Sequence, residues 1–461
     1  MTVWLALVVA VTAATGFLLS PRARDTGSFF RGRSIDGAPP GLLTLTFSQV
    51  TTWIFARSLL NAAILGYYFG IGGTLAYAAY YLSFVTGAWI IRELRFRQGY
   101  PSIHAFLSAR FGAVGVGCYT IVIALRLVSE VFANLLVVGL LFGAADSMGY
   151  ALSVILVGAL TLGYAVRGGL LASLRTDVLQ MSVFLALLIG LVAVAGLSAG
   201  FSLPAIIESS PDIASAGWVL LMVALLQVWS YPMHDPVMMD RGFIADRRVT
   251  MASFYHAAWI SILCIMAFGL LGVYGGLHRA EGEELIATLT RLLGDVPMLL
   301  FSAALIVSAM STLDSALSSA AKLGIVDMRL GGETVRNGRL AMAGFLVAGL
   351  LMVFIGSQDL FSAVAISGTA SMYLAPVIFF SLWLRWSVPV WAYAASFVAA
   401  MVGAGVYFGE EAGYLQLMTP LLGLEHKYSK LLAISGTVLA VGCGAFLAAW
   451  AIRRHVAPAT T

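Results

Sequence analysis

Hydrophobic runs long enough to cross a lipid bilayer recur along the whole chain, and short polar or glycine-containing segments separate them. A membrane-spanning helix needs about 20 mostly apolar residues, because each residue advances the helix by about 1.5 Å. We therefore predict 13 spans with no soluble domain between them, at residues 2–20, 41–69, 73–93, 113–143, 150–166, 172–197, 217–238, 252–275, 296–325, 339–356, 359–384, 389–408 and 430–452.

The second predicted span contains a stretch, residues 51–58 (TTWIFARS), that is too polar for a helix facing lipid. Four glycines follow it, at Gly66, Gly70, Gly72 and Gly73. Irregular backbone at membrane depth is tolerated only where it lines a cavity or coordinates a ligand. We therefore predict that this helix is broken, and a kinked helix that only packs against its neighbours is the alternative.

The ninth predicted span carries a stripe of hydroxyl groups. At about 100° per residue, five hydroxyl residues fall on one helical face beside Asp314. Neutral oxygens spaced in this way suit a small alkali cation that must be bound and then released. The alternative is that these side chains serve close helix packing and bond back to their own helix. The five residues are Ser308, Ser311, Thr312, Ser315 and Ser319.

Two further spans carry ionisable residues at membrane depth, where such residues usually face the protein interior. Arg126, Glu130 and Asn134 in the fourth span share one helical face. Arg126 either pairs with Glu130 along the helix or holds an anionic group of a transported solute. At the start of the sixth span, Asp177 either caps the helix, pairs with Arg175, or belongs to a cation path.

The seventh predicted span ends in the sequence QVWSYPMHDP, residues 227–236. Two prolines in so short a stretch predict a helix that unwinds, here beside a cavity. His234 is interpreted as either a hydrogen-bonded structural residue or a proton carrier.

Composition and charge agree with a membrane protein. Of the 461 residues, 60% are hydrophobic and only 10% are charged, far from the balance of a soluble domain. Basic residues crowd alternate loops, such as 92–97, 241–248 and 329–339, whereas 281–284 and 410–411 are acidic. This pattern sets topology and does not indicate a nucleic-acid partner; it places the first terminus outside and the last in the cytoplasm. The first span is predicted to be a retained helix, with a cleaved signal peptide as the alternative.

The sequence offers no enzyme motif. We find no nucleotide-binding loop, no paired-histidine metal helix and no nucleophile with a base at a usable spacing. The three cysteines lie within apolar runs and imply neither a disulfide nor a metal site.

Several motifs resemble those of the sodium:solute symporter family. Ser147 and Tyr150 are followed, after thirteen mostly small or apolar residues, by residues 164–172 (YAVRGGLLA), and residues 308–315 (SAMSTLDS) resemble a second family hallmark. Residues 28–34 (SFFRGRS) and 110–112 (RFG) also agree. The resemblance covers essentially the full chain, including 13 spans with the first terminus outside, as in the sodium/proline and sodium/pantothenate members of the family.

This resemblance implies an all-α integral membrane protein with a LeuT-type inverted repeat of five plus five helices and extra helices at both ends, in the inner (plasma) membrane. Residues 1–461 would form a single transporter domain. Residues 1–40 would hold the first extra helix and a cytoplasmic loop, and 41–197 the first repeat. Residues 217–384 with 389–408 would form the second repeat and the following helix, and 430–461 the last helix and cytoplasmic tail.

The resemblance also implies a sodium ion as the coupling ion and assigns its ligands by position. Asp177 matches an aspartate that serves sodium coupling or a second sodium in some members, and Ser315 is a further contributor there. Ser58 and Trp229 match solute-contacting positions, whereas Phe55 and Arg57 depart from the family pattern, in which small residues are usual. The sodium ligands would be the carbonyls of Thr51, Ile54 and Ser308 with the hydroxyls of Ser311 and Thr312.

The departures from the family pattern point to the solute. Arg57 and Arg126 together suggest a carboxylate, because the guanidinium fork matches carboxylate geometry. Glu130 or Asp235 would then meet an amino group. The expected function is sodium-driven uptake of a small carboxylate or amino acid, proline-like, by alternating access. The alternatives are a symporter-like sensor of a signalling system, proton coupling, and transport of a sugar or urea; the oligomeric state is left open.

Overall fold

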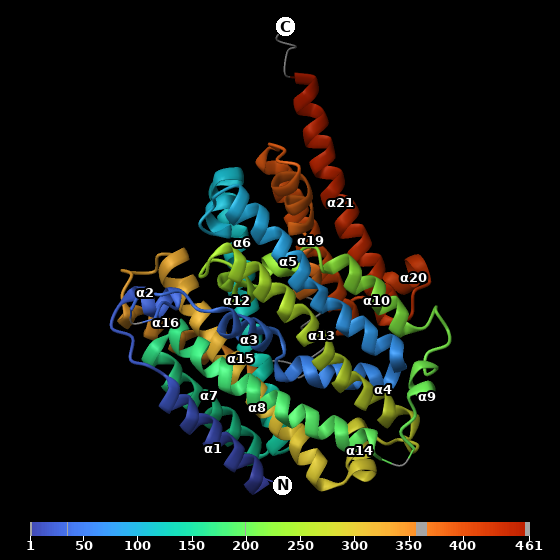
Figure 1. Cartoon of the computed structure of the whole chain (residues 1–461). Coiled ribbons are helices and arrows are strands. Elements are labelled where there is room, and N and C mark those ends of the chain that lie inside the picture. Colours follow the sequence, from blue (N-terminus) through green and yellow to red (C-terminus); the bar gives the residue numbers. More distant parts are fainter. Residues whose placement is uncertain (1, 35, 199, 356–366, 457–461) are drawn as a thin grey trace.

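The computed structural model describes residues 2–34, 36–198, 200–355 and 367–456, and within these residues all secondary structure is helical. Figure 1 shows the helices packed side by side, with α1 starting at one end of the molecule and α21 ending at the other. The helices are α1 (Thr2–Leu19), α2 (Thr26–Arg31), α3 (Leu42–Trp53), α4 (Ala56–Ala79), η1 (Tyr80–Leu82), α5 (Ser83–Ile91), η2 (Arg92–Arg97), α6 (Ile103–Phe142), α7 (Met148–Gly168), α8 (Leu170–Gly196), α9 (Leu203–Ile207), α10 (Ala216–Gln227), α11 (Tyr231–His234), α12 (Pro236–Arg241), α13 (Arg247–Leu277), α14 (Leu285–Leu293), α15 (Asp295–Lys322), η3 (Leu323–Asp327), α16 (Val335–Ile355), α18 (Leu374–Pro376), η4 (Val377–Trp383), α19 (Val390–Glu411), α20 (Met418–Leu422) and α21 (Lys427–Val456).

The described residues contain 10 helical stretches that are long and apolar enough to cross a membrane, so the predicted number of 13 is not confirmed. The second and third predicted spans run into one stretch, because α4 continues past a non-helical glycine, Gly70, toward Arg97. The seventh predicted span is divided into three short helices, α10, α11 and α12. The eleventh, 359–384, begins among residues 356–366, outside the described part of the chain.

Helix α15 lies at the centre of the fold. In its membrane-crossing window 83% of the residues are buried, compared with 28% for α1 and for α16. A helix surrounded by protein rather than lipid can carry polar side chains, because neighbouring helices supply their hydrogen-bond partners. The hydroxyl stripe predicted in the ninth span therefore lies inside the protein: Ser308, Ser311, Thr312, Ser315 and Ser319 are all buried.

Close packing of α4 against α13 fixes the position of the segment that follows the broken helix. Gly272 of α13 lies so close to α4 that a Cβ atom there would overlap the carbonyl oxygen of Ala63. Gly269 and Gly276 make similar close approaches to Thr74 and Tyr67. Small residues at helix contacts let two backbones approach closely in a membrane, where hydrophobic association between helices is weak.

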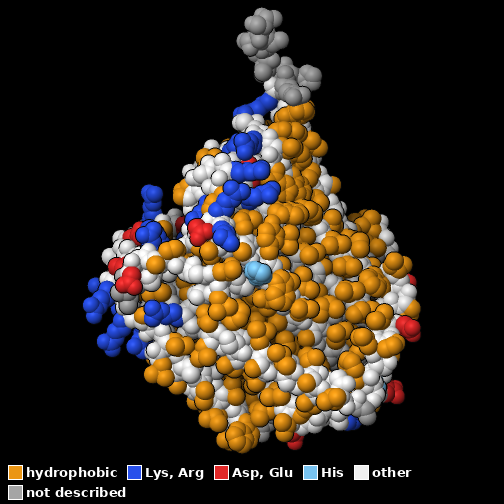
Figure 2. Space-filling model, viewed as in Figure 1, with side chains coloured by type: hydrophobic (Ala, Val, Ile, Leu, Met, Phe, Trp, Pro, Cys, Tyr) orange, Lys and Arg blue, Asp and Glu red, His pale blue; other side chains and the backbone are white. Residues whose placement is uncertain are grey.

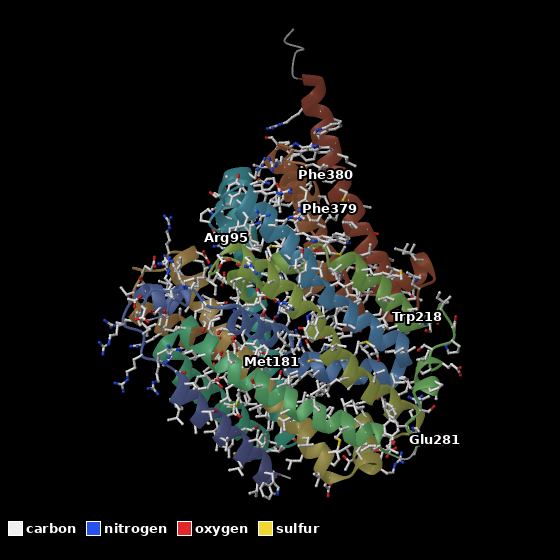
Figure 3. All side chains as sticks on the ribbon, viewed as in Figure 1. Arg95, Met181, Trp218, Glu281, Phe379 and Phe380 are labelled. Carbon is white, nitrogen blue, oxygen red and sulfur yellow. The ribbon has the colours of Figure 1, made fainter. Side chains whose placement is uncertain are left out.

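The surface divides into an apolar band and two polar ends. Figure 2 shows hydrophobic side chains covering most of the visible face, with most of the visible Lys and Arg gathered on one side, while acidic side chains lie both among them and along the opposite edge. Arg95 and Glu281 mark these two ends in Figure 3. The chain is thus a multi-pass membrane protein. The charge asymmetry follows the loop pattern of the sequence, and the assignment of the basic end to the cytoplasm stays a prediction.

Candidate functional site

The predicted break in the second span is confirmed. Helix α3 ends at Trp53, and the next two residues, Ile54 (φ −85°, ψ 66°) and Phe55 (φ −90°, ψ 158°), are not helical before α4 begins at Ala56. The last carbonyl groups of α3 therefore lack the amide partners that a continuous helix would give them. These carbonyl oxygens are buried at the centre of the protein, directly beside α15.

Two hydroxyl side chains of α15 contact these carbonyl groups. Thr312 Oγ1 donates to the carbonyl oxygens of Thr51, at 2.8 Å, and of Ser308, at 3.0 Å. Ser308 Oγ donates to the carbonyl oxygen of Ile54. Hydrogen bonds at the contact between the helix break and α15 therefore join four of the five residues expected to bind sodium, and no carboxylate takes part in these bonds. This donor set suits a weakly held alkali cation rather than a transition metal.

The fifth residue, Ser311, faces a neighbouring cluster around Asp177. Ser311 Oγ donates to Asp177 Oδ1 at 2.8 Å, and Ser48 Oγ of α3 lies 2.5 Å from Asp177 Oδ2. Arg241 of α12 lies 3.7 Å from Asp177 Oδ2 and donates to Ser48 Oγ at 2.7 Å and to Ser315 Oγ at 2.8 Å. Asp177 therefore neither caps its helix nor pairs with Arg175; its partner is an arginine that the sequence placed in a loop.

Asp314 is a second buried carboxylate in this region. Its Oδ2 accepts a hydrogen bond from Thr176 Oγ1 at 2.9 Å, and its buried Oδ1 has no hydrogen-bond partner among the described residues. Sequence reasoning noted Asp314 only as a neighbour of the hydroxyl stripe. Its position three residues after Ser311 places it on nearly the same helical face and is the signal that it faces the interior, where it contacts α8.

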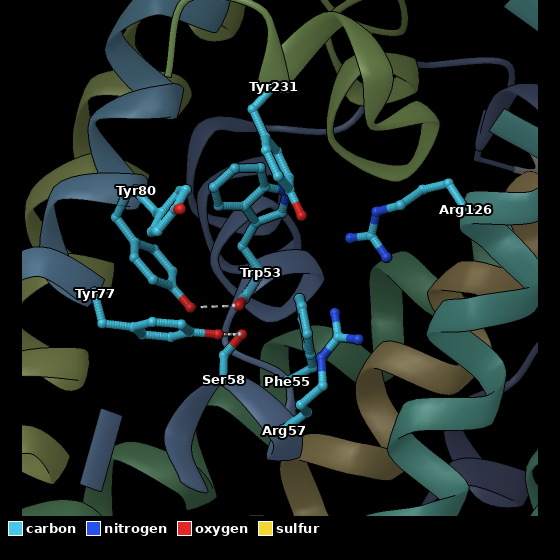
Figure 4. A pocket seen from close by; sticks show the side chains of 9 residues that line it. Trp53, Phe55, Arg57, Ser58, Tyr77, Tyr80, Arg126 and Tyr231 are labelled. Atoms are coloured by element: carbon cyan, nitrogen blue, oxygen red, sulfur yellow. Dashed lines mark hydrogen bonds between the residues drawn. The ribbon is translucent and has the colours of Figure 1, made fainter. Parts of the chain in front are cut away.

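A small cavity of about 20 Å³ lies beside the broken helix. Figure 4 shows guanidinium groups from α4 and α6 at one end of this cavity and aromatic rings at the other. Small-molecule sites in proteins are larger than this, but they likewise combine apolar walls with a few polar groups. The cavity is lined by Trp53, Phe55, Arg57, Ser58, Tyr77, Tyr80, Tyr81, Arg126 and Tyr231.

The two arginines of the cavity have different surroundings. Arg57 is 1% exposed, and its Nε and Nη1 atoms have no hydrogen-bond partner among the described residues. Its guanidinium group lies 5.0 Å from the centre of the Phe55 ring. In contrast, Arg126 Nη2 donates to Asp235 Oδ2 at 2.9 Å, and Nη1 lies 3.1 Å from Glu130 Oε2.

Of the six residues expected to bind solute, three line the cavity: Arg57, Ser58 and Arg126. Glu130 and Asp235 lie behind Arg126 as its ion-pair partners. Trp229 is not in the cavity. Its ring lies 6.3 Å from that of Trp89 and 6.2 Å from that of Trp383, in a separate cleft.

The misplacement of Trp229 follows from the unwinding of its span. The chain forms a turn after α10 ends at Gln227, and α11 begins at Tyr231. This turn directs Trp229 outward and Tyr231 toward the cavity. The predicted unwinding is confirmed, and His234 lies beside it with its Nε2 atom 2.9 Å from Ser367 Oγ. The cavity tyrosines Tyr77, Tyr80 and Tyr81 were missed, although they recur along one helix after the break.

Comparisons with known proteins agree with this fold. No family model matches the chain. A putative sodium-dependent multivitamin transporter of Drosophila melanogaster is 24% identical over 200 residues, which cover 42% of this chain and 32% of that relative. The match thus spans about a third of the relative's length.

Two solved structures are similar over nearly the full chain. A sodium-coupled sialic acid symporter in a substrate-bound, outward-open state has a TM-score of 0.71 at 15% identity, covering 97% of both chains. A nucleobase-cation-symport-1 family transporter has a TM-score of 0.54 at 15% identity, covering 94% of this chain and 95% of its own. These similarities confirm the expected LeuT-type fold class, and at this level of identity they bear on the fold alone.

Proposed function

We propose that this protein is a sodium-coupled symporter that moves a small carboxylate-bearing organic solute by alternating access. The observation that carries the proposal is the contact between the helix break and α15, where carbonyl and hydroxyl oxygens meet beside a cavity containing a buried arginine. Broken helices that present backbone oxygens to an ion at membrane depth are the usual construction of secondary transporters. The names of the similar proteins support the same reading.

In this proposal, sodium supplies one positive charge that ties the two helices together and can be released when they separate. In the described structure, hydrogen bonds from Ser308 and Thr312 occupy the same carbonyl oxygens. These bonds keep the oxygens satisfied when the ion is absent, so that the protein does not have to hold the ion tightly. The residues that would bind sodium are Thr51, Ile54, Ser308, Ser311 and Thr312.

Asp177 and Ser315 form the proposed second coupling site. Arg241 already contacts both residues in this structure, so a second cation would have to displace its guanidinium group. Asp314, with one oxygen unpaired, adds a carboxylate that takes either a cation or a proton. Proton coupling is therefore the second candidate, and it is carried by this residue.

The proposed setting is the plasma membrane, with the basic end of the molecule in the cytoplasm. A positive charge that moves inward gains about 2.3 kcal/mol for every 100 mV of membrane potential. A carboxylate that enters with one sodium loses the same amount, so a one-to-one pair is driven by the sodium concentration gradient alone, whereas a second sodium would add the contribution of the membrane potential.

The test is uptake into proteoliposomes with an inward gradient of sodium or potassium at the same fixed pH on both sides. The panel contains carboxylates, amino acids, a sugar and urea. The proposal expects a carboxylate to accumulate only with sodium. Accumulation of sugar or urea instead would overturn the solute class, and equal uptake in potassium combined with dependence on a proton gradient would replace sodium by the proton.

A further inference from the structure

Arg57 carries a buried charge without a direct acidic partner. None of the described carboxylates forms an ion pair with it, and the other charged residue that lines the cavity is also a cation, Arg126. A buried charge is costly unless an opposite charge or a full set of hydrogen bonds accompanies it. Because Arg57 lines the cavity, the natural partner is a negative group on the solute.

Arg126 is not an equivalent partner for a negative group of the solute, because its guanidinium group already forms ion pairs with two carboxylates. Glu130 and Asp235 contact its two terminal nitrogen atoms. Asp235 also accepts a hydrogen bond from the Met238 amide through Oδ1, at 3.0 Å, and so begins α12. The group formed by Arg126, Glu130 and Asp235 therefore connects α6 to the unwound seventh span. Moving Asp235 to an amino group of a solute would break both connections.

The remaining walls of the cavity are aromatic, and no carboxylate is among the nine lining residues. Three of the tyrosine hydroxyls already donate hydrogen bonds within the protein: Tyr77 to Ser58 and Tyr81 to the carbonyl of Trp53, which also line the cavity, and Tyr80 to Gln227. These residues therefore present ring surface rather than polar groups to the cavity. The body of a matching solute is compact and apolar.

We propose that the solute is a monocarboxylate without an amino group and that Arg57 is its single counter-ion. This inference rests on the proposed transport function and narrows it, since it removes the proline-like amino acid as the preferred solute. Arg57 is then the residue that determines specificity, and Arg126 is a positioning residue that holds the unwound span in place.

The same charges give a reason for coupling to sodium. Glu130 and Asp235 carry one more negative charge than Arg126 carries positive charge, and neither forms an ion pair with Arg57. A carboxylate that entered alone would leave the centre with an unbalanced negative charge. A cation at Ile54, three residues before Arg57, restores the balance, because interactions between charges are strong at short range inside a protein. An uncharged or zwitterionic solute would not create this requirement.

The experiment measures solute binding to the purified full-length protein, from the shift in thermal unfolding temperature at saturating sodium. The compounds form matched sets in which only the polar groups differ. One set is propionate, alanine and propionamide; a second is cyclopentanecarboxylate, proline and cyclopentanecarboxamide; a third is phenylpropionate, phenylalanine and phenylpropionamide. We expect at least one carboxylate to bind about 10- to 100-fold more tightly than its amino-acid and amide counterparts, the range given by one charge-assisted hydrogen-bonded contact.

Two variants assign the effect to Arg57. Arg57→Gln should weaken carboxylate binding about 10- to 100-fold and still be stabilised by sodium, which shows that it is folded. Arg175→Gln, which changes an exposed arginine of α8, should bind as the unchanged protein does. The inference is overturned if proline or another amino acid binds as tightly as its matched carboxylate, if no monocarboxylate binds, or if Arg57→Gln binds the carboxylate normally.

These outcomes are separable from failure of the proposed function. Binding of a carboxylate that depends on Arg57 but not on sodium would reject sodium coupling and retain the solute class. Sodium-dependent stabilisation and uptake with an amino acid as the preferred solute would retain symport and reject the solute class.

Discussion

Replacing Thr312 by valine removes one hydroxyl group from the proposed sodium site with little change in volume. Thr312 Oγ1 contacts the carbonyl oxygens of Thr51 and Ser308, so its loss takes one oxygen from the site and leaves these two buried carbonyls without that donor. An unsatisfied buried polar group costs about 1–3 kcal/mol. If sodium binding loses the same amount, the sodium concentration for half-maximal uptake should rise about 5- to 150-fold.

The assay is the initial rate of solute uptake into proteoliposomes across a wide range of sodium concentrations, at constant ionic strength and pH. Uptake by Thr312→Val should recover at high sodium, because the change affects ion affinity rather than the solute cavity. The matched control is Ser318→Ala, which removes a buried hydroxyl of the same helix whose one hydrogen bond among the described residues is to the carbonyl of Asp314, at 2.8 Å. An unchanged sodium dependence in Thr312→Val, or an equal shift in Ser318→Ala, would refute the reasoning.

Two further predictions concern stability. Asp177→Asn should destabilise the protein by about 3 kcal/mol, because it leaves Arg241 as a buried charge without its ion-pair partner; an unfolding temperature equal to that of the unchanged protein would show that Arg241 is neutralised in another way. Gly272→Ala should also lower the unfolding temperature, by the equivalent of about 1–3 kcal/mol, because the added methyl group overlaps Ala63 and forces α13 away from α4. For comparison, Gly344→Ala on α16, where a Cβ atom meets nothing, should leave the unfolding temperature unchanged.

Local sequence patterns were sufficient to predict those features of the fold and the candidate site that depend on a single helix. The polar stretch at 51–58 predicted the break at Ile54, and the spacing of Ser308 and Thr312 predicted that both would lie on the same buried face of α15. The Arg126–Glu130 contact was also one of the alternatives, because residues four apart on a helix are neighbours.

Contacts between distant segments were not accessible in the same way. Arg241 is the partner of Asp177, and Asp235 is a partner of Arg126. Both contacts depend on where the unwound seventh span lies against α6 and α8. The prediction that Trp229 contacts the solute was wrong for a related reason. The turn after Gln227 changes the direction of the Trp229 side chain, and helical periodicity does not predict this change. The number of spans differed because hydropathy does not reveal where a helix is divided or continues past a glycine.

The most direct test of the central claim is whether the solute moves sodium. Coupling between two ligands is reciprocal, so an inward gradient of a transported carboxylate should drive radioactive sodium into proteoliposomes that start with equal sodium on both sides. The account predicts sodium entry that depends on the carboxylate and requires higher sodium in Thr312→Val. Carboxylate entry without any accompanying sodium movement would contradict it.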